Sequence, residues 1–275
     1  MSSGKPIIES NRGPRSLRKN IRFAWGSGLQ ELRKRFDDSV LGGLWLVINP
    51  ALLILVYWAV FDLIVGIKFT DPTTGREVPF LAAFSIGFFL YLTLAELMNG
   101  ASGWMKAKRR YVLESDLPIW AILGGLVARV FIQYIFYTMV VLGVCIAYQL
   151  STVQGAFLYL LASFVVFLVF VGLAVIFAII GSYFGDVKEL LPVLNRVLFY
   201  TSSITFPLTL VPPTLKWIPA MNPLTWPVEL MRDLLLWGVR DPLSHIWPAL
   251  ALAAGIWSIA VLLYWRLSDR IAEVV

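Results

Sequence analysis

The chain has 275 residues, of which 59% are hydrophobic and 15% are charged, with a net charge of +6 and a mean hydropathy of +0.77. Soluble domains carry about 25% charged residues, so this composition excludes a water-soluble enzyme. A lone cysteine, Cys145, excludes an internal disulfide. The apolar runs are continuous, which excludes a membrane β-barrel with alternating strands. An all-α polytopic membrane protein remains.

The first 40 residues are basic and mostly polar, which predicts a cytoplasmic segment, 1–40, before a transmembrane domain, 41–275. Residues 14–36 have the pattern of an amphipathic interface helix with its basic side chains on the far face. Its apolar arc comprises Leu17, Ile21, Trp25, Gly28, Leu32 and Phe36. Two interpretations stand: an anchor that sets topology, or a collar that positions the first span and touches a cytoplasmic partner.

Six runs reach the roughly 20 apolar residues that a membrane-crossing helix needs. They are 44–66, 80–103, 120–150, 156–181, 190–210 and 246–265. An even number of spans puts both termini on one side. Seventeen Lys and Arg fall on that side and five on the other, so the positive-inside rule predicts cytoplasmic termini.

Two ionisable residues, Glu96 and Arg129, lie inside the predicted second and third spans. An unpaired charge at that depth costs several kcal/mol. Their depths, roughly 10 and 14 Å from the cytoplasmic ends, match closely enough for these antiparallel neighbours to form an ion pair. Asn99 is a candidate to add a hydrogen bond. The pair either clips two helices together or relays protons.

The segment between the fifth and sixth spans, 206–245, is apolar but interrupted by seven prolines. Asn222 followed by Pro223 predicts the start of a short helix that ends at Gly238, and a further turn is predicted over 213–219. Irregular backbone at membrane depth must be buried in protein or face a wet cavity. We therefore expect re-entrant helices near the outer mouth, serving either as an interface cap or as a gate.

The chain lacks the residues required for metal binding by soft ligands and for ATP binding by a phosphate loop. One His and one Cys provide no soft-ligand metal cluster, and no Gly-rich loop ends in Gly-Lys-Ser/Thr to hold ATP. We therefore expect no catalytic site, no metal and no cofactor in this chain. Asp37-Asp38 is an acidic pair without a second cluster, which makes an integral-membrane transferase the weaker class.

Several motifs along the chain occur together in one known family. They are Arg33-Lys34-Arg35-Phe36, Ser39-Val40-Leu41-Gly42-Gly43-Leu44-Trp45, Asn49-Pro50, Phe184-Gly185-Asp186-Val187-Lys188-Glu189-Leu190-Leu191-Pro192, Phe206-Pro207, Met221-Asn222-Pro223-Leu224-Thr225 and Glu229-Leu230-Met231-Arg232-Asp233. With these motifs the chain resembles the type-2 ABC transporter permeases, and most closely those that export O-antigen, capsule or teichoic acid on a lipid carrier. One departure is Gly185-Asp186, where the family often has Arg-Asp.

The resemblance implies a homodimer in the bacterial inner membrane that moves lipid-linked polysaccharide, with two copies of a separate ATPase subunit that bind ATP and Mg. It also implies contacts to that ATPase from a short helix after span two and from the turn at 186–189. The coupling residues would be Lys108, Arg109, Arg110, Tyr111, Asp186, Lys188 and Glu189; the outer gate would include Pro213, Asn222, Pro223, Glu229 and Arg232. The alternative for the basic cluster is topogenic charge alone.

Aromatic residues make up 14% of the chain, and aromatic rings offer flat platforms for the C–H faces of sugars. The resemblance implies a central channel lined by spans one and five of both copies. The candidate lining residues are Trp45, Asn49, Tyr57, Phe61, Phe199, Tyr200 and Phe206. Packing in the core or against lipid is an equal alternative for each. At the level of the whole protein, a permease for a small hydrophobic drug or lipid is the runner-up.

Overall fold

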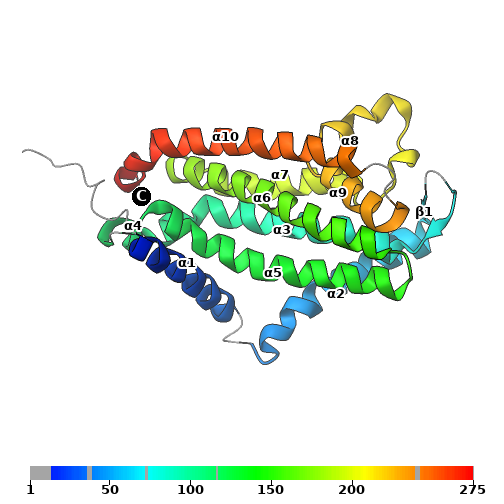
Figure 1. The fold of residues 1–275 in the computed structure, drawn as a ribbon, viewed down its shortest axis with the longest axis horizontal. Coiled ribbons are helices and arrows are strands. Elements are labelled where there is room, and N and C mark those ends of the chain that lie inside the picture. Colours follow the sequence, from blue (N-terminus) through cyan, green and yellow to red (C-terminus); the bar gives the residue numbers. More distant parts are fainter. Residues whose placement is uncertain (1–13, 36–38, 72–73, 116, 239–241, 275) are drawn as a thin grey trace, which may run out of the picture.

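The computed structural model describes residues 14–35, 39–71, 74–115, 117–238 and 242–274. Figure 1 shows long helices lying side by side along one axis. The ten α-helices of these residues are α1 (Pro14–Lys34), α2 (Trp45–Trp58), α3 (Phe80–Ala107), α4 (Arg109–Glu114), α5 (Ile119–Ala147), α6 (Val153–Tyr183), α7 (Val187–Thr201), α8 (Trp217–Met221), α9 (Thr225–Arg232) and α10 (Pro242–Val274). The predicted helical class is therefore observed.

Five helical segments among the described residues are long and apolar enough to cross a membrane. They are Gly42–Ile64, Phe80–Ala107, Ile119–Ala147, Val153–Tyr183 and Leu250–Leu267. Each corresponds to one of the predicted spans. Within the first of them, the helix widens into a π-helical turn over Ala59–Ile64.

The predicted fifth span, 190–210, differs in the structure. Its helix, α7, has 15 residues, fewer than the roughly 20 required for a crossing, and the backbone becomes extended at Ser202. The Ser202 hydroxyl donates to the Phe199 carbonyl at 2.9 Å, and a serine that bonds to nearby backbone in this way competes with helix continuation. The count of six spans is therefore not reached among the described residues.

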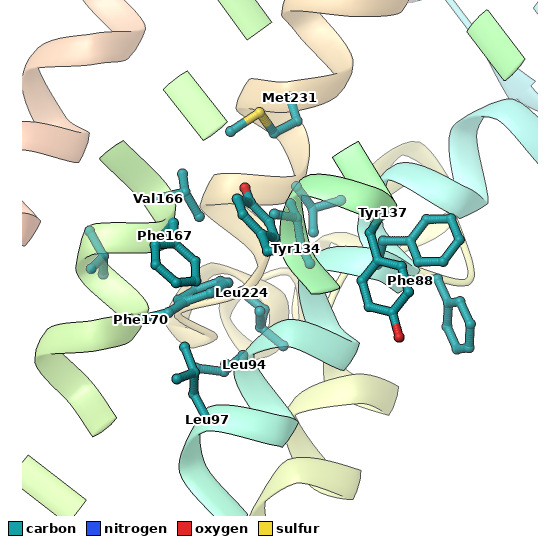
Figure 2. Close-up of a cluster of buried hydrophobic side chains, with 14 of the residues drawn as sticks. Phe88, Leu94, Leu97, Tyr134, Tyr137, Val166, Phe167, Phe170, Leu224 and Met231 are labelled. Atoms are coloured by element: carbon teal, nitrogen blue, oxygen red, sulfur yellow. The ribbon is translucent and has the colours of Figure 1, made fainter. Parts of the chain in front are cut away.

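Helix α3 is the centre of the bundle. It packs against α5, α6, α7 and α9, and 72% of its most apolar stretch is buried, compared with 6% for the first span. Figure 2 shows part of this core, with Leu94 and Leu97 of α3 close to Phe167 and Phe170 of α6. The first span lies at the edge of the bundle.

Small residues let the core helices approach closely. A Cβ added to Gly181 on α6 would lie only 2.3 Å from the Ser102 carbonyl oxygen of α3. Close approach of this kind replaces the hydrophobic driving force that is absent between helices in lipid. At the start of α6, the Thr152 hydroxyl accepts a hydrogen bond from the Gly155 amide at 3.0 Å, which fixes where that helix begins.

Helix α1 packs obliquely along α5 (Figure 1). Its buried face includes Ala24, Gly28 and Leu32, whereas Leu17 and Trp25 of the predicted apolar arc are exposed. One edge of the arc therefore packs against α5, and the other edge is exposed. The last member of the arc, Phe36, and residues 1–13 of the predicted N-terminal segment lie outside the described residues.

A small hairpin connects the first two spans, which the all-α prediction missed. Strand β1 (Phe69–Thr70) pairs antiparallel with β2 (Glu77–Val78). Gly75, with a φ of 69°, lies in the connection between the two strands. Phe69 and Val78 are buried against the bundle, so the hairpin covers the end of α3.

The segment after α7 folds into short pieces beside the ends of α3 and α6. The turn predicted over 213–219 is a 3-10 turn, Pro213–Leu215, followed by α8. The helix predicted from Pro223 begins later, as α9 at Thr225, and continues through a π-helical turn, Asp233–Trp237. Gly238 then takes a φ of 70° and ends it, as predicted.

Candidate functional site

Aromatic side chains from three helices meet where the C-terminal half of α2 approaches the core. The Tyr57 ring centroid lies 5.1 Å from that of Phe84 and 5.7 Å from that of Phe88 on α3, and 5.4 Å from that of Phe199 on α7. Phe61 stacks on Tyr57 at 6.0 Å. Tilted and offset rings at these distances attract one another beyond their burial. This aromatic cluster therefore joins α2 to α3 and α7.

The seven residues predicted to line a channel do not share one surface of the chain. Tyr57 and Phe61 are half-buried in the aromatic cluster, and Phe199 is buried behind them. Tyr200, by contrast, is 61% exposed on α7, and Phe206 is half-buried beyond the end of that helix. Within a single copy, Tyr200 is the most open of these five.

Trp45 and Asn49 lie at the opposite end of α2 and line a polar cavity of about 300 Å³ between α2 and α5. Gln133 and Tyr137 of α5 also line it, and Gln133 Nε2 donates to the Tyr137 hydroxyl at 2.6 Å. Sequence reasoning missed these two residues. A signal was present, because Arg129, Gln133 and Tyr137 are spaced by four and so lie along one face of a helix.

The ion pair predicted from helix depths is formed: Arg129 Nη2 lies 2.9 Å from Glu96 Oε1. The same carboxylate oxygen accepts from Arg35 Nη1 at 3.3 Å, which was not predicted. No local pattern could indicate this contact, because it depends on how α1 crosses α5. Asn99 makes a different bond from the one expected, since its Oδ1 accepts from Asn195 Nδ2 at 3.0 Å and so links α3 to α7.

The two segments predicted to contact an ATPase lie at the same end of the bundle. Figure 1 shows α4 at the end where α6 turns into α7. A Cβ on Gly185 in that turn would lie 4.0 Å from Lys106 Nζ at the end of α3. The exposed members of the predicted set are Arg109, Arg110, Tyr111, Asp186, Lys188 and Glu189.

Lys108, the remaining member of that set, is turned toward α1. Its ammonium group donates to the Glu31 carboxylate, and this bond lowers the pKa of Glu31. The Tyr111 ring of α4 also lies 5.3 Å from the Phe23 ring of α1. Helix α1 therefore braces α4 from the side, and the basic side chains of α4 remain exposed beside this contact.

Arg232 ties the outer segment to the bundle. Its guanidinium is 1% exposed and donates to the carbonyl oxygens of Ala83, Ser203 and Ile204, and to the Glu229 carboxylate at 2.9 Å. Of the predicted gate residues, Glu229 and Arg232 are thus paired. Two carbonyl oxygens of the irregular backbone after α7, those of Ser203 and Ile204, thus have a donor in this side chain.

The other three predicted gate residues differ in their exposure to solvent. Pro213 and Pro223 are exposed, whereas Asn222 is buried. The Asn222 amide donates to the Leu198 carbonyl at 2.7 Å, and its oxygen accepts from the Leu224 amide at 2.8 Å. Asn222 therefore fastens the end of α7 to the start of α9. Among the described residues, no group of three or more His, Cys, Asp or Glu could hold a metal ion.

The sequence of this chain is similar to those of known membrane transport proteins. The family model described as ABC-2 type transporter matches residues 27–236. The polysialic acid transport protein KpsM of Escherichia coli is 27% identical over 210 residues, which cover 76% of this chain and 80% of KpsM. The O-antigen export system permease protein RfbA of Klebsiella pneumoniae is 25% identical over 213 residues, covering 77% and 79%. Because the family model spans most of the chain, including four of the five helical segments long and apolar enough to cross a membrane, this protein belongs to the ABC-2 type transporter family of membrane permeases.

Proposed function

We propose that this chain is the channel-forming subunit of an ATP-driven exporter that moves lipid-linked polysaccharide, of the O-antigen or capsular type, across the bacterial inner membrane. The observation that carries the proposal is the similarity, over more than three quarters of the chain, to permeases named for polysialic acid transport and O-antigen export. A permease of this family works with a separate ATPase, which would bind ATP and Mg.

The ATPase would dock on the end of the bundle that holds α4 and the α6–α7 turn. Two features support this surface. Arg109 and Arg110 are exposed on a helix that projects beyond the membrane-crossing core, and α1 braces it through the Glu31–Lys108 pair. A rigid projecting helix transmits a push from the ATPase into α3 and α5, which flank it in the chain.

The channel would form between two copies of the chain. Helix α2 carries a continuous apolar surface that is almost entirely unburied within one copy, and the aromatic cluster holds its C-terminal half beside α7. In a homodimer, α2 and α7 of both copies would enclose the path, with Tyr200 reaching toward it. Both termini would lie in the cytoplasm with α4.

The test uses a bacterial strain that lacks this gene, complemented with wild-type or variant chain, and measures polysaccharide at the cell surface. Arg109→Glu combined with Arg110→Glu should abolish surface polymer and co-purification of the ATPase, because it reverses the charge on the docking surface. Arg76→Glu, an exposed arginine in the hairpin between the first two spans, is the matched control and should leave both unchanged.

Two outcomes would refute the proposal. Normal surface polymer in the strain without the gene would exclude polysaccharide export and favour a drug or lipid substrate. Metal-dependent glycosyl transfer by the purified chain alone would instead identify a membrane transferase.

A further inference from the structure

A second cavity, of about 310 Å³, lies among α1, α5, α6 and α10. No charged, hydroxyl or amide side chain lines it, and we call it the apolar slot. Its lining includes Trp25 of α1, Trp120 and Phe131 of α5, Phe164 of α6 and Trp257 of α10. The volume is at the small end of the range of ligand pockets, which suits one slender hydrocarbon chain.

The apolar slot has the depth of one membrane leaflet. Its lining on α5 runs from Trp120, the second residue of that helix, to Phe131. The eleven residues between these positions rise roughly 17 Å along the helix, close to half of the hydrocarbon core, which is about 30 Å thick. A lipid with its head group at the start of α5, near α4 (Figure 1), could therefore extend one chain to the middle of the membrane.

Aromatic contacts fix the walls of the slot. The Phe131 ring centroid lies 6.1 Å from that of Trp25 and 5.1 Å from that of Phe167, so rings of α1, α5 and α6 join there. On α10, Trp257 Nε1 donates to a backbone carbonyl of α6 at 3.0 Å, which satisfies its polar atom. Trp25 and Phe164 are 45% and 52% exposed, so the slot is open to the surrounding lipid.

Two cations lie at the α1 edge of the slot. Arg18 precedes Ile21 by three residues and Arg22 precedes Trp25 by three, and both Ile21 and Trp25 line the slot. Residues three apart are neighbours on a helix surface, so each arginine adjoins a lining side chain. Both arginines are exposed, and neither side chain has a hydrogen bond or ion pair with another described residue. No Asp or Glu occurs in residues 14–30, so the edge is uniformly basic.

From these observations we infer that the apolar slot holds one acyl chain of an anionic phospholipid whose head group is bound by Arg18 and Arg22. Basic amphipathic helices attract anionic lipid through charge and through buried apolar area, and the slot adds a defined place for the chain. The inference does not depend on what the exporter carries and so goes beyond the proposed function. Because α1 braces α4, a lipid held here would also support the proposed ATPase-docking surface.

The test uses the full chain in phosphatidylcholine nanodiscs that contain increasing fractions of phosphatidylglycerol with a diazirine in the middle of one acyl chain. After illumination, mass spectrometry of the digested chain locates the label. Labelling of the peptides that contain Phe131 and Phe164 should saturate, and phosphatidylcholine with the same diazirine chain should need about a tenfold higher fraction. Equal labelling by the two lipids overturns the inference, because it shows lipid contact without selection of the head group.

Paired variants test the two cations. Arg18→Gln combined with Arg22→Gln should raise the fraction of phosphatidylglycerol needed for half-maximal labelling about tenfold. Arg33→Gln combined with Lys34→Gln is the matched control, because it removes the same charge from exposed positions at the other end of α1, and it should label as the wild type does. An equal loss in both double variants shows attraction to the whole basic surface and overturns the assignment to this site.

A larger side chain inside the slot tests the place of the acyl chain. Val127 is half-buried on α5 and lines the slot, so Val127→Phe should lower labelling at saturation several-fold. Val140→Phe makes the same change at a half-buried position of α5 outside the slot and should leave labelling unchanged. Wild-type labelling of both variants places the chain elsewhere and overturns the inference. The arginine variants, at exposed positions, decide the matter if Val127→Phe does not fold.

Two further arms address other occupants of the slot. A tenfold excess of farnesyl diphosphate should leave labelling by phosphatidylglycerol unchanged, and displacement would assign the slot to an isoprenoid carrier and overturn the inference. Protection of the slot peptides from both phospholipids would show that a second copy of the chain covers them, which also overturns it. Neither an ATPase nor a glycan takes part, so a failure here leaves the surface-polymer result untouched.

Discussion

At the scale of single residues, Arg232 shows how a buried charge replaces missing backbone hydrogen bonds. Its three carbonyl acceptors belong to α3 and to the irregular turn after α7, and its guanidinium carbon lies 4.5 Å from the centre of the Phe69 ring. One side chain therefore joins four segments that are distant in the sequence: the hairpin, α3, the turn and α9. A cation of this kind is stable only while its partners surround it.

We predict that Arg232→Met lowers the stability of the protein by about 3–5 kcal/mol, because it removes the buried donor to the Ser203 and Ile204 carbonyls and leaves Glu229 without its cation. In detergent, the melting temperature should fall by roughly 10 °C. Arg232→Lys should recover only part of the loss, since an ammonium cannot reach all the acceptors at once. Lys216→Met removes an exposed cation from the same outer segment and should change nothing. A wild-type melting curve for Arg232→Met would contradict this role.

At the scale of elements, the contact of α1 with α5 depends on glycines. A Cβ on Gly28 would lie 2.7 Å from the Gly125 carbonyl oxygen and 2.9 Å from the Ala128 Cβ, and backbone at those positions cannot move aside. Gly26, half a turn away, has nothing within 4 Å of its added Cβ. A side chain at either position would therefore have the same intrinsic effect on the helix, but only one at Gly28 would clash with α5.

We predict that Gly28→Val releases α1 from α5, whereas Gly26→Val leaves it bound. Valine carries the same helix-propensity cost at both positions, so the difference between the variants isolates the steric clash. Limited trypsin digestion at Arg18, Lys19 and Arg22, all exposed on α1, should accelerate several-fold in Gly28→Val. Equal cleavage of the two variants would show that α1 does not depend on this close approach.

At the scale of the whole molecule, the proposed homodimer requires α2 to meet a second copy. Leu52 and Val56 lie one turn apart on α2 and are 54% and 59% exposed within one chain. Phe157 and Phe164 on α6 are similarly exposed, at 67% and 52%, but they lie on a helix of the bundle that the proposed channel does not use. Exposure alone therefore does not separate the two surfaces.

We predict that Leu52→Cys and Val56→Cys form disulfide-linked dimers in native membranes under mild oxidation, while Phe157→Cys and Phe164→Cys do not. The native Cys145 is buried and should add no background. Mobility on a non-reducing gel measures the result. Cross-linking of both pairs to the same extent would indicate random collision, and cross-linking of the α6 pair alone would place the interface elsewhere.

Local sequence was enough to place most of the helices and one long-range contact. Hydropathy is a sum over consecutive residues, so five of the six predicted spans agree with the structure in position. The pair between Glu96 and Arg129 was predictable because a short connection forces two spans to be neighbours, and the cost of an unpaired charge in the membrane supplies the rest.

The sequence by itself therefore determined that this protein crosses a membrane, where its long helices lie and that Glu96 needs a cation. Only the tertiary structure decided that α7 stops at Thr201, that Arg35 shares Glu96, that Arg232 is enclosed by backbone carbonyls and that Trp45 and Tyr57 belong to different sites. The physical reason is that the hydropathy of a span is a property of its own consecutive residues, whereas these contacts depend on crossing angles and on side chains from segments far apart in the chain.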